Sequence, residues 1–547
     1  MKQTISIAVI LIILFFSSCK NKQKVDTIIT NAHIYTINEN NDTAQSIAIS
    51  NGTISAVGSN DYILNHYQSD SIVDLNGKYV YPAFADAHAH FWGLAKFLGE
   101  CNLYGTTSVS EIIQRLKIFH QQNKDRLWII GRGWDQNLFS DKSLPTKEAL
   151  DSVFADIPVC LIRVDGHAIW TNSKAIELAN INSKAKIEGG EILLNKNSEP
   201  SGIFLDNATS LIEKHIPDIP YSTMIKLLQK ADTICQQNHL QYIHDAGLDL
   251  HQILLLDSLI EHHLIKTKIY AMASLTKENL NYFLKHGFIN KDNFKVRSFK
   301  IYADGALGSR GALLKQKYAD LKNDKTASQQ KNDYGLLLIS TDSLKKCLSL
   351  LYKNNFQVCT HAIGDSANKL VLQLYAELLK PQDDKRWRIE HAQIVDTADL
   401  WYFKKYKILP SVQPTHAISD KSWAIQRLGK DRICFAYSYQ SLWKQNNILP
   451  LGTDFPVEDV SPFKTFFAAV FRCDYDLKDT TVFRPEEKLT RLQTLRGMTI
   501  DAAYAAFLEK ETGSIEVGKK AEFTILDFDL MTISKEKLSQ YIKSQSN

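Results

Sequence analysis

The chain has 547 residues, of which 44% are hydrophobic and 23% are charged, and these values are ordinary for a folded protein rather than a disordered one. The 64 basic and 60 acidic residues leave a net charge of +4, which does not indicate a nucleic-acid-binding surface. The 24 glycines and 13 prolines exclude collagen-like and low-complexity chains, and eight cysteines are too few for a disulfide-dense scaffold.

The first segment of the chain is typical of an export signal. A charged start precedes an apolar stretch at 5–16, which ends in two serines and Cys19 before a basic segment. This stretch is too short to span a bilayer, and its pattern describes a secretory signal. Its end resembles a bacterial lipoprotein signal, in which residues 1–18 are removed and Cys19 carries the lipid. We therefore expect an exported protein, tethered to a membrane and facing the periplasm or on the outer membrane. An ordinary cleaved signal and a short N-terminal anchor are the alternatives.

Short strands are predicted at both ends of the remaining chain. The dipeptide Asn51-Gly52 lies between two apolar, β-branched segments and predicts a hairpin. A second hairpin is predicted over 513–526. We expect the segments 25–80 and 505–535 to pair into one β-sandwich.

Between these ends, short apolar strands end in polar residues and are followed by helical stretches. The eight predicted strands cover 83–90, 241–245, 268–274, 296–303, 356–361, 386–391, 408–413 and 448–454. Alternating strands and helices indicate a parallel sheet, and eight of them predict an α/β fold, a (β/α)8 TIM-type barrel over 81–504. An open, doubly wound sheet is the alternative, but no glycine-rich phosphate loop follows the first strand.

The first two predicted strands are separated by residues 91–240, far more than a crossover connection needs. We therefore expect an inserted α/β subdomain at about 95–238, directly after strand 1. From that position it would cover the site and help to select the substrate.

The segment 82–90 reads PAFADAHAH and places two histidines one pleat apart. Residues two apart in a strand point to the same side. We therefore expect Phe84, Asp86, His88 and His90 to face the barrel interior and the alanines between them to face the helices. Two imidazoles on one face can chelate a divalent ion, although two structural histidines would look the same.

Three more predicted strands end in residues that can bind a metal. His361, His391 and Asp454 end the fifth, sixth and eighth strands. Each alone is more readily explained by packing. Four histidines and an aspartate at one end of one barrel, however, predict a site for one or two divalent ions, with zinc favoured.

Lys300 lies on the inward face of the fourth predicted strand, together with Ser298, Tyr302 and Asp304. Burial disfavours the ammonium ion and lowers its pKa. A neutral amine can add carbon dioxide to give a carbamate, which could bridge two metals. The alternative is an ion pair with Asp304 or another inward carboxylate.

Together, these motifs resemble those of the amidohydrolase superfamily, most of all its YtcJ-like branch. The resemblance runs from about 25 to 530 and is carried by PAFADAHAH (82–90), RGWDQNLF (132–139), DGHAIWTNSKAIE (165–177), IHDAG (243–247), KIYADGALGSRGA (300–312), THAIGDSAN (360–368), RIEHAQ (388–393), QPTH (413–416) and GTDFPVE (452–458). One departure is Ala83, where the family usually has glycine, and the added methyl group is small enough for the site to persist.

The resemblance implies a β-sandwich flanking a metal-bearing barrel. It also implies a ligand arrangement, with His88 and His90 on one metal, His361 and His391 on a second, Lys300 between the metals and Asp454 near the attacked carbonyl. Metal-activated water would then hydrolyse an amide-type C–N bond in an amide, a formamide or a cyclic amide. Members of this branch include deformylases of N-substituted formamides.

Two residues are assigned to the chemistry itself. Asp454 would act as general base and then general acid. His416 would donate to the oxyanion, or else hold Asp454 or a metal ligand in place. The remaining candidates for contact with a small amide substrate are Trp134, Asp135, His167, Trp170, Arg310 and Glu458.

Several alternatives remain open at this level. Arg310 could bind a substrate carboxylate or fix its own loop, and the tryptophans could form an aromatic wall or the core of the subdomain. The same scaffold could support a deaminase or a phosphoesterase. A metal- or solute-binding lipoprotein without activity could also use these histidines, but it would show a closed ligand set.

Overall fold

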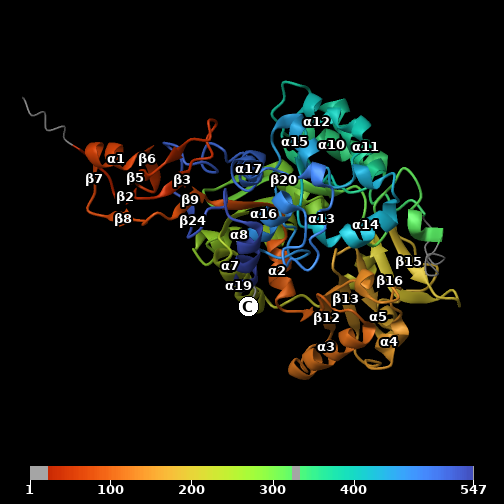
Figure 1. Ribbon diagram of the computed structural model, residues 1–547. Helices are drawn as coiled ribbons and strands as arrows, with labels where there is room; N and C mark the ends of the chain where they lie inside the picture. Colours follow the sequence, from red (N-terminus) through yellow and green to blue (C-terminus); the bar gives the residue numbers. More distant parts are fainter. Residues whose placement is uncertain (1–21, 323–332, 546–547) are drawn as a thin grey trace, which may run out of the picture.

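The computed structural model describes residues 22–322 and 333–545, so the predicted signal and Cys19 lie outside the described residues. Its centre is a parallel sheet that curves into a barrel of the TIM type (Figure 1). The strands on this path, in spatial order, are β10 (Phe84–Ala89), β17 (Leu240–Leu248), β18 (Lys268–Ser274), β20 (Phe294–Tyr302), β21 (Gln357–Ala362), β22 (Arg388–His391) and β23 (Leu409–Ser411). They correspond to the first seven predicted strands.

The eighth predicted strand, 448–454, forms only an isolated parallel bridge at Leu451. Backbone hydrogen bonds nevertheless join this segment to the first strand, because the Ala87 amide donates to the Leu451 carbonyl at 3.0 Å and the Asp454 amide donates to the His88 carbonyl at 2.7 Å. The segment therefore links the last strand to the first and brings Asp454 beside His88.

Helices cover the outer face of the barrel. They include α2 (Phe91–Phe97), α7 (Tyr221–Gln237), α8 (Leu250–Glu261), α9 (Lys277–His286), α10 (Thr341–Lys353), α11 (Asp365–Leu378), α12 (Trp401–Tyr406), α15 (Tyr439–Asn446) and α16 (Pro462–Phe471). On β20, Phe299, Ile301 and Ala303 belong to the core shared with these helices, as predicted, and Lys300 points to the inside. Across the described ranges, no helix combines the length and apolarity that a membrane span requires.

The first barrel strand does not alternate as predicted. The alanines at 83, 85 and 87 pack inside the barrel, whereas Phe84 packs among the helix-facing residues. The pairing of β10 with β17 shifts between Asp86 and Ala89, which marks a β-bulge. The extra residue reverses which side of the strand successive residues face. His88 and His90 therefore face the interior, as predicted, although Phe84 faces the helices.

Two four-stranded sheets form a β-sandwich beside the barrel (Figure 1). One sheet contains β6 (Thr53–Gly58), β5 (Ser46–Ser50), β2 (Thr27–Thr30) and β8 (Ile72–Asp74), and the other contains β24 (Phe523–Leu526), β9 (Tyr79–Pro82), β3 (His33–Tyr35) and β4 (Thr43–Ala44). Strand β24 pairs with β9, so both ends of the chain contribute. Asn51 and Gly52 both have positive φ, 52° and 69°, as the turn between β5 and β6 requires.

The second predicted hairpin, over 513–526, does not form. Only β24 is a strand there, and Lys520 makes a single bridge to Thr53. Ile515 is buried in the core between the two sheets and its amide donates to the Thr36 carbonyl. The segment before β24 therefore closes the sandwich core instead of pairing along its length.

The chain between β10 and β17 contains a separate six-stranded sheet, on the opposite side of the barrel from the sandwich (Figure 1). Its strands, in spatial order, are β11 (Cys101–Asn102), β12 (Ile129–Trp134), β13 (Val159–Arg163), β14 (Ala168–Thr171), β16 (Pro200–Asp206) and β15 (Gly190–Leu194). Helix α7 packs against α2 and β17 and belongs to the barrel core. The six-stranded sheet and the helices around it form the inserted subdomain, which has hydrophobic cores of its own, distinct from that of the barrel.

Trp134 and Trp170 lie in one of these cores and are fully buried. Their ring centroids are 6.3 Å apart, and the indole N–H groups donate to the carbonyls of Leu161 at 2.8 Å and Thr146 at 3.0 Å. The prediction that they contact the substrate is wrong, because both rings and both N–H groups are already satisfied inside the subdomain.

We predict that Trp134→Ala lowers the free energy of unfolding by about 3–5 kcal/mol, because it leaves a cavity in this core. Denaturant unfolding followed by circular dichroism measures the change. Trp401→Ala is the control, since Trp401 is 45% exposed and its loss is expected to change stability only slightly. A Trp134→Ala protein of unchanged stability would contradict this assignment.

Candidate metal centre

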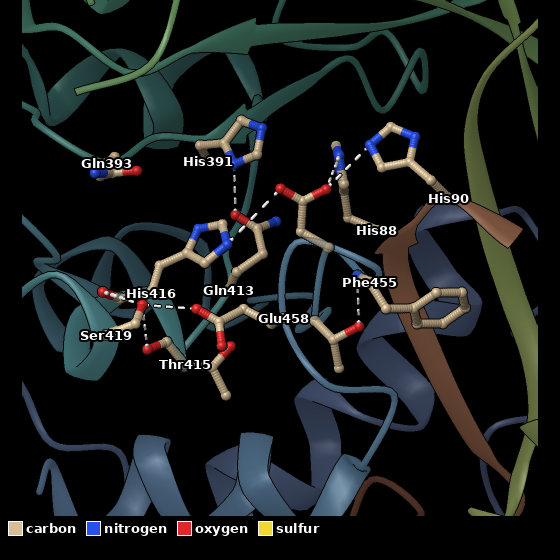
Figure 2. Close-up of polar contacts among 12 residues, drawn as sticks. His88, His90, His391, Gln393, Gln413, Thr415, His416, Ser419, Phe455 and Glu458 are labelled. Atoms are coloured by element: carbon tan, nitrogen blue, oxygen red, sulfur yellow. Dashed lines mark hydrogen bonds and ion pairs between the residues drawn. The ribbon is translucent and has the colours of Figure 1, made fainter. Parts of the chain in front are cut away.

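The C-terminal ends of the barrel strands bring the predicted ligands together. His88 and His90 lie at the end of β10, His361 lies on β21, and β22 ends at His391. Figure 2 shows His88, His90, His391 and His416 gathered in one centre. The Asp454 carboxylate lies near the Nε2 atoms of His88 and His90. One donor atom each from His88, His391 and Asp454 lies within 4.8 Å of the others.

Each of three histidines is held through Nδ1, so that Nε2 is left for a metal. The pairs are His88 with Glu390 Oε2 at 2.5 Å, His90 with the Ala246 carbonyl at 2.8 Å, and His391 with Gln413 Oε1 at 2.7 Å. An acceptor for the Nδ1 proton fixes the tautomer and the ring orientation of a histidine ligand. His361 differs, because its Nε2 is the nitrogen that lies near a carbonyl, 3.5 Å from that of Gly305. Its Nδ1 is therefore the nitrogen left for a metal.

The free nitrogens converge on the carboxylate of Asp454. Its Oδ1 lies 3.0 Å from His90 Nε2 and 3.7 Å from His88 Nε2, and its Oδ2 lies 3.7 Å from His416 Nε2. Burial opposes ionisation of this group, but the contacts with His90, His88 and His391 hold the pKa of Asp454 well below its usual range. The carboxylate is therefore an anion at neutral pH.

Burial also disfavours the charged form of the histidines, which for an imidazole means a lower pKa. It lowers the pKa of His88 to about 4, with a further contribution from the charge of Lys300. Burial also holds the pKa values of His361 and His391 well below the usual range. All three imidazoles are therefore neutral at pH 7, which is the form that binds metals.

Lys300 points into the same centre. Its Nζ lies 3.0 Å from His88 Nε2, the side chain is 1% exposed, and burial lowers the pKa of the amine. The alternative ion pair with Asp304 does not form. Both Asp304 oxygens instead accept backbone amides, from Ile363 at 2.9 Å and from Gly364 at 2.8 Å.

Two buried charges behind His88 were not predicted from the sequence. Glu390 Oε1 lies 2.6 Å from Arg388 Nε, and both side chains are fully buried. Burial opposes ionisation of Glu390, but Arg388 and His88 lower its pKa far below the usual range. The signal was present, because Arg388 and Glu390 lie two apart on the strand that ends in His391.

Three buried aspartates fix the backbone of the loops that carry the ligands. Asp86 accepts from the Thr453 amide at 3.1 Å, Asp245 from the Phe91 amide at 2.9 Å, and Asp304 from the Ile363 amide at 2.9 Å. Thr453 and Phe91 are next to Asp454 and His90 in the chain, and Ile363 is two residues after His361. The ligand positions are therefore set by the barrel and do not depend on flexible loops.

The residues fit a divalent cation. Neutral imidazole nitrogens and an ionised carboxylate oxygen are the donors that zinc uses. His416 Nε2 is a buried atom that has no hydrogen-bond partner within the described part of the chain, and it lies 3.7 Å from Asp454 Oδ2. A group that completes the site would also give this nitrogen a partner.

A cavity of about 720 Å³ opens over the centre. It is lined by His90, Lys300, His361, His391, His416 and Asp454, and by Asp135, His167 and Glu458 from the predicted substrate contacts. His167 Nδ1 lies 2.8 Å from Asp206 Oδ1, and Glu458 accepts from Ser419 Oγ at 2.6 Å. The inserted subdomain and the barrel thus form one cavity.

Arg310 does not line this cavity. Its Nη2 lies 2.9 Å from Asp320 Oδ2 in the same loop, so the carboxylate-binding role predicted for it is wrong and its loop-fixing role is the one observed. Among the cavity residues that sequence reasoning passed over are Arg132, Arg163 and Asp165. Arg132 and Asp165 begin the motifs RGWDQNLF and DGHAIWTNSKAIE. Their place in these motifs was the sequence signal that could have identified them.

We predict that Glu390→Gln weakens metal binding about 10- to 100-fold, because it removes the anion that orients His88 although Glu390 is not itself a ligand. Metal content after dialysis against graded chelator measures this. Glu377→Gln is the control, since Glu377 is half-exposed and pairs with Lys345 away from the centre. Equal metal retention by both variants would contradict the role assigned to Glu390.

Known proteins resemble this chain over most of its length. Residues 71–543 match the model of the amidohydrolase family. Protein LONG AFTER FAR-RED 3 of Arabidopsis thaliana is 30% identical over 92% of this chain and 87% of its own length. Putative amidohydrolase YtcJ of Bacillus subtilis is 29% identical, over 92% of this chain and 95% of its own length. N-substituted formamide deformylase of Arthrobacter pascens is 23% identical, over 93% and 94%.

Among solved structures, an uncharacterized metal-dependent hydrolase from Pyrococcus horikoshii superposes with a TM-score of 0.74 at 26% identity, covering 93% of this chain and 99% of that one. The family match spans most of the sequence and includes every residue of the candidate centre. The chain therefore belongs to the amidohydrolase family and is a metal-dependent hydrolase with a TIM-type barrel.

Proposed function

We propose that this protein hydrolyses a carbon–nitrogen bond of the amide type, in an amide, a formamide or a cyclic amide, with Asp454 as the general base and acid. The observation that carries the proposal is the position of the Asp454 carboxylate, which faces the open cavity and the free nitrogens of His88, His90 and His416. The similarity to a deformylase of N-substituted formamides supports this bond type.

The ligands of the proposed centre are His88, His90, His361, His391 and Asp454, holding one or two divalent ions, with zinc favoured by the nitrogen-rich donor set. When bound, such a cation lowers the pKa of water and polarises the scissile carbonyl. The cavity leaves access to this centre, which a purely structural or storage site with a closed ligand set would not need.

Lys300 is proposed to carry a carboxyl group. The neutral amine would add carbon dioxide at Nζ and release one proton, so that a buried neutral group becomes an anion beside His88. Two observations support this step: the burial of the side chain and the 3.0 Å distance to His88 Nε2.

The proton transfers belong to residues of the chain. Asp454 takes the proton from the attacking water and delivers it to the leaving nitrogen. His416 stacks on His391 with ring centroids 6.0 Å apart, and its Nε2 is directed at the region beside Asp454. There it is placed to donate to the oxygen that becomes negative as the carbonyl is attacked.

We predict that the metal-loaded protein hydrolyses at least one member of a panel of N-formyl, N-acyl and cyclic amides, and that Asp454→Asn lowers kcat by at least about 100-fold, because no group then accepts the proton. Steady-state kinetics measure both. Asp431→Asn, at an exposed position, is the control and should retain activity. Release of ammonia from aminopurines or hydrolysis of phosphotriesters, without amide hydrolysis, would identify a different reaction.

Export as a lipoprotein is a separate proposal that rests on residues 1–19 of the sequence alone. Lipidation of Cys19 would hold the protein at a membrane of the envelope, facing the periplasm or on the outer membrane. We predict that Cys19→Ala moves the protein from the membrane fraction to the soluble fraction, measured by fractionation and immunoblotting. Cys434→Ala is the control for loss of an exposed thiol. Unchanged fractionation of Cys19→Ala would contradict lipidation.

A further inference from the structure

Arg132 is a cation in the wall of the cavity that no role described so far uses. It lies on β12, in the inserted subdomain, and it lines the same cavity as His90, His391 and Asp454. The side chain is half-buried, and its Nε atom is fully enclosed. It therefore presents a positive charge to whatever occupies the space above the metal centre.

The neighbouring arginine shows how a structural guanidinium is satisfied in this cavity. Arg163 is paired with both Asp135 and Asp165. Arg132, in contrast, forms no ion pair with any carboxylate in 22–322 or 333–545, and its Nε has no hydrogen-bond partner there. Its nearest polar group is the hydroxyl of Tyr104, and the charge of Glu100 acts on it without forming an ion pair. A half-buried guanidinium in a cavity wall is favoured when a ligand in the cavity supplies an acceptor and a counter-charge.

Arg132 is held in place relative to the catalytic loop. The ring of Tyr104 lies against Gly133, which has φ of 111° and has no room for a side chain. The Tyr104 hydroxyl donates to the Pro456 carbonyl, two residues after Asp454. The charge of Asp454 also acts on Arg132. Tyr104 thus joins the strand that carries Arg132 to the loop that follows the proposed general base.

We propose that Arg132 binds a carboxylate of the substrate, so that the substrate is an amide with a carboxylate close to the scissile bond, as in an N-acyl amino acid. This inference rests on the proposed function. A guanidinium binds a carboxylate through two parallel hydrogen bonds, which also fixes the orientation of the amide. The cavity volume is in the range of small-molecule sites.

The charge of the cavity favours a carboxylate over a phosphate. Asp135, Asp165, Asp420 and Glu458 line the same space, and only Asp135 and Asp165 are paired with an arginine. A doubly charged group would meet more repulsion here than one guanidinium can offset. A single carboxylate needs one guanidinium, and Arg132 supplies it. Lys96 is another cation of the lining, but it is exposed to solvent.

The test compares N-acetylphenylalanine with N-acetylphenethylamine, which differ only in the carboxylate. In the metal-loaded protein, Arg132→Met should lower kcat/KM for the acid about 10- to 100-fold, mainly through KM, and should leave the neutral amide within about threefold. Arg126→Met is the matched control, because Arg126 belongs to the same subdomain but packs over Phe119 outside the cavity lining. An equal loss for both compounds would overturn the proposal.

Binding is measured separately, so that failure of this inference can be told from failure of the proposed function. Isothermal titration uses ketone analogues of both compounds, in which a methylene group replaces the amide nitrogen and prevents hydrolysis. Tighter binding of the acid analogue that is lost in Arg132→Met supports the proposal even if neither amide is hydrolysed. Binding of the acid analogue that is unchanged in Arg132→Met, or that is lost in Lys96→Met instead, would overturn it.

Discussion

The buried ion pair between Arg388 and Glu390 is the interaction on which the centre depends. Both groups are fully enclosed, so each needs the other to remain charged in a medium where an isolated ion is strongly destabilised. The pair holds Glu390 as an anion behind His88, where it accepts the Nδ1 proton and turns Nε2 toward Asp454. Arg388 also donates to the carbonyl of Ala87. One ion pair thus positions both the ring and the backbone of the first ligand strand.

A second constraint is the way in which the barrel closes. The segment that carries Asp454 is too irregular to form a full strand, yet hydrogen bonds join it to β10. The Asp454 amide donates to the His88 carbonyl, and the Thr453 amide donates to the Asp86 carboxylate. The bulge in β10 allows Asp86 to reach this segment while His88 faces the interior. The irregularity of both elements is therefore what brings a carboxylate and an imidazole together, since two regular strands would keep them at the spacing of a sheet.

The barrel and the inserted subdomain divide the work of the site. The barrel supplies neutral imidazoles, the buried amine of Lys300 and the carboxylate of Asp454, all of them at strand ends. The subdomain supplies polar groups on the other side of the cavity, among them His167 and Arg132. Because the subdomain has its own core, its cavity-facing residues can differ between proteins without disturbing the metal centre. The two parts of the fold thus contribute different groups to one cavity.

The sequence by itself determined seven strands of the barrel and placed the candidate ligands at their ends, because the alternation of strands and helices is a local pattern. It did not determine which way the alanines before His88 point, since a bulge depends on pairing with a distant strand. It also could not distinguish a cavity wall from a core: Trp134 and Arg132 lie two apart on one strand, and only the packing of β12 against its neighbours buries the first and leaves the second facing the cavity. Tertiary structure decided these points because burial depends on contacts between segments that are far apart in the chain.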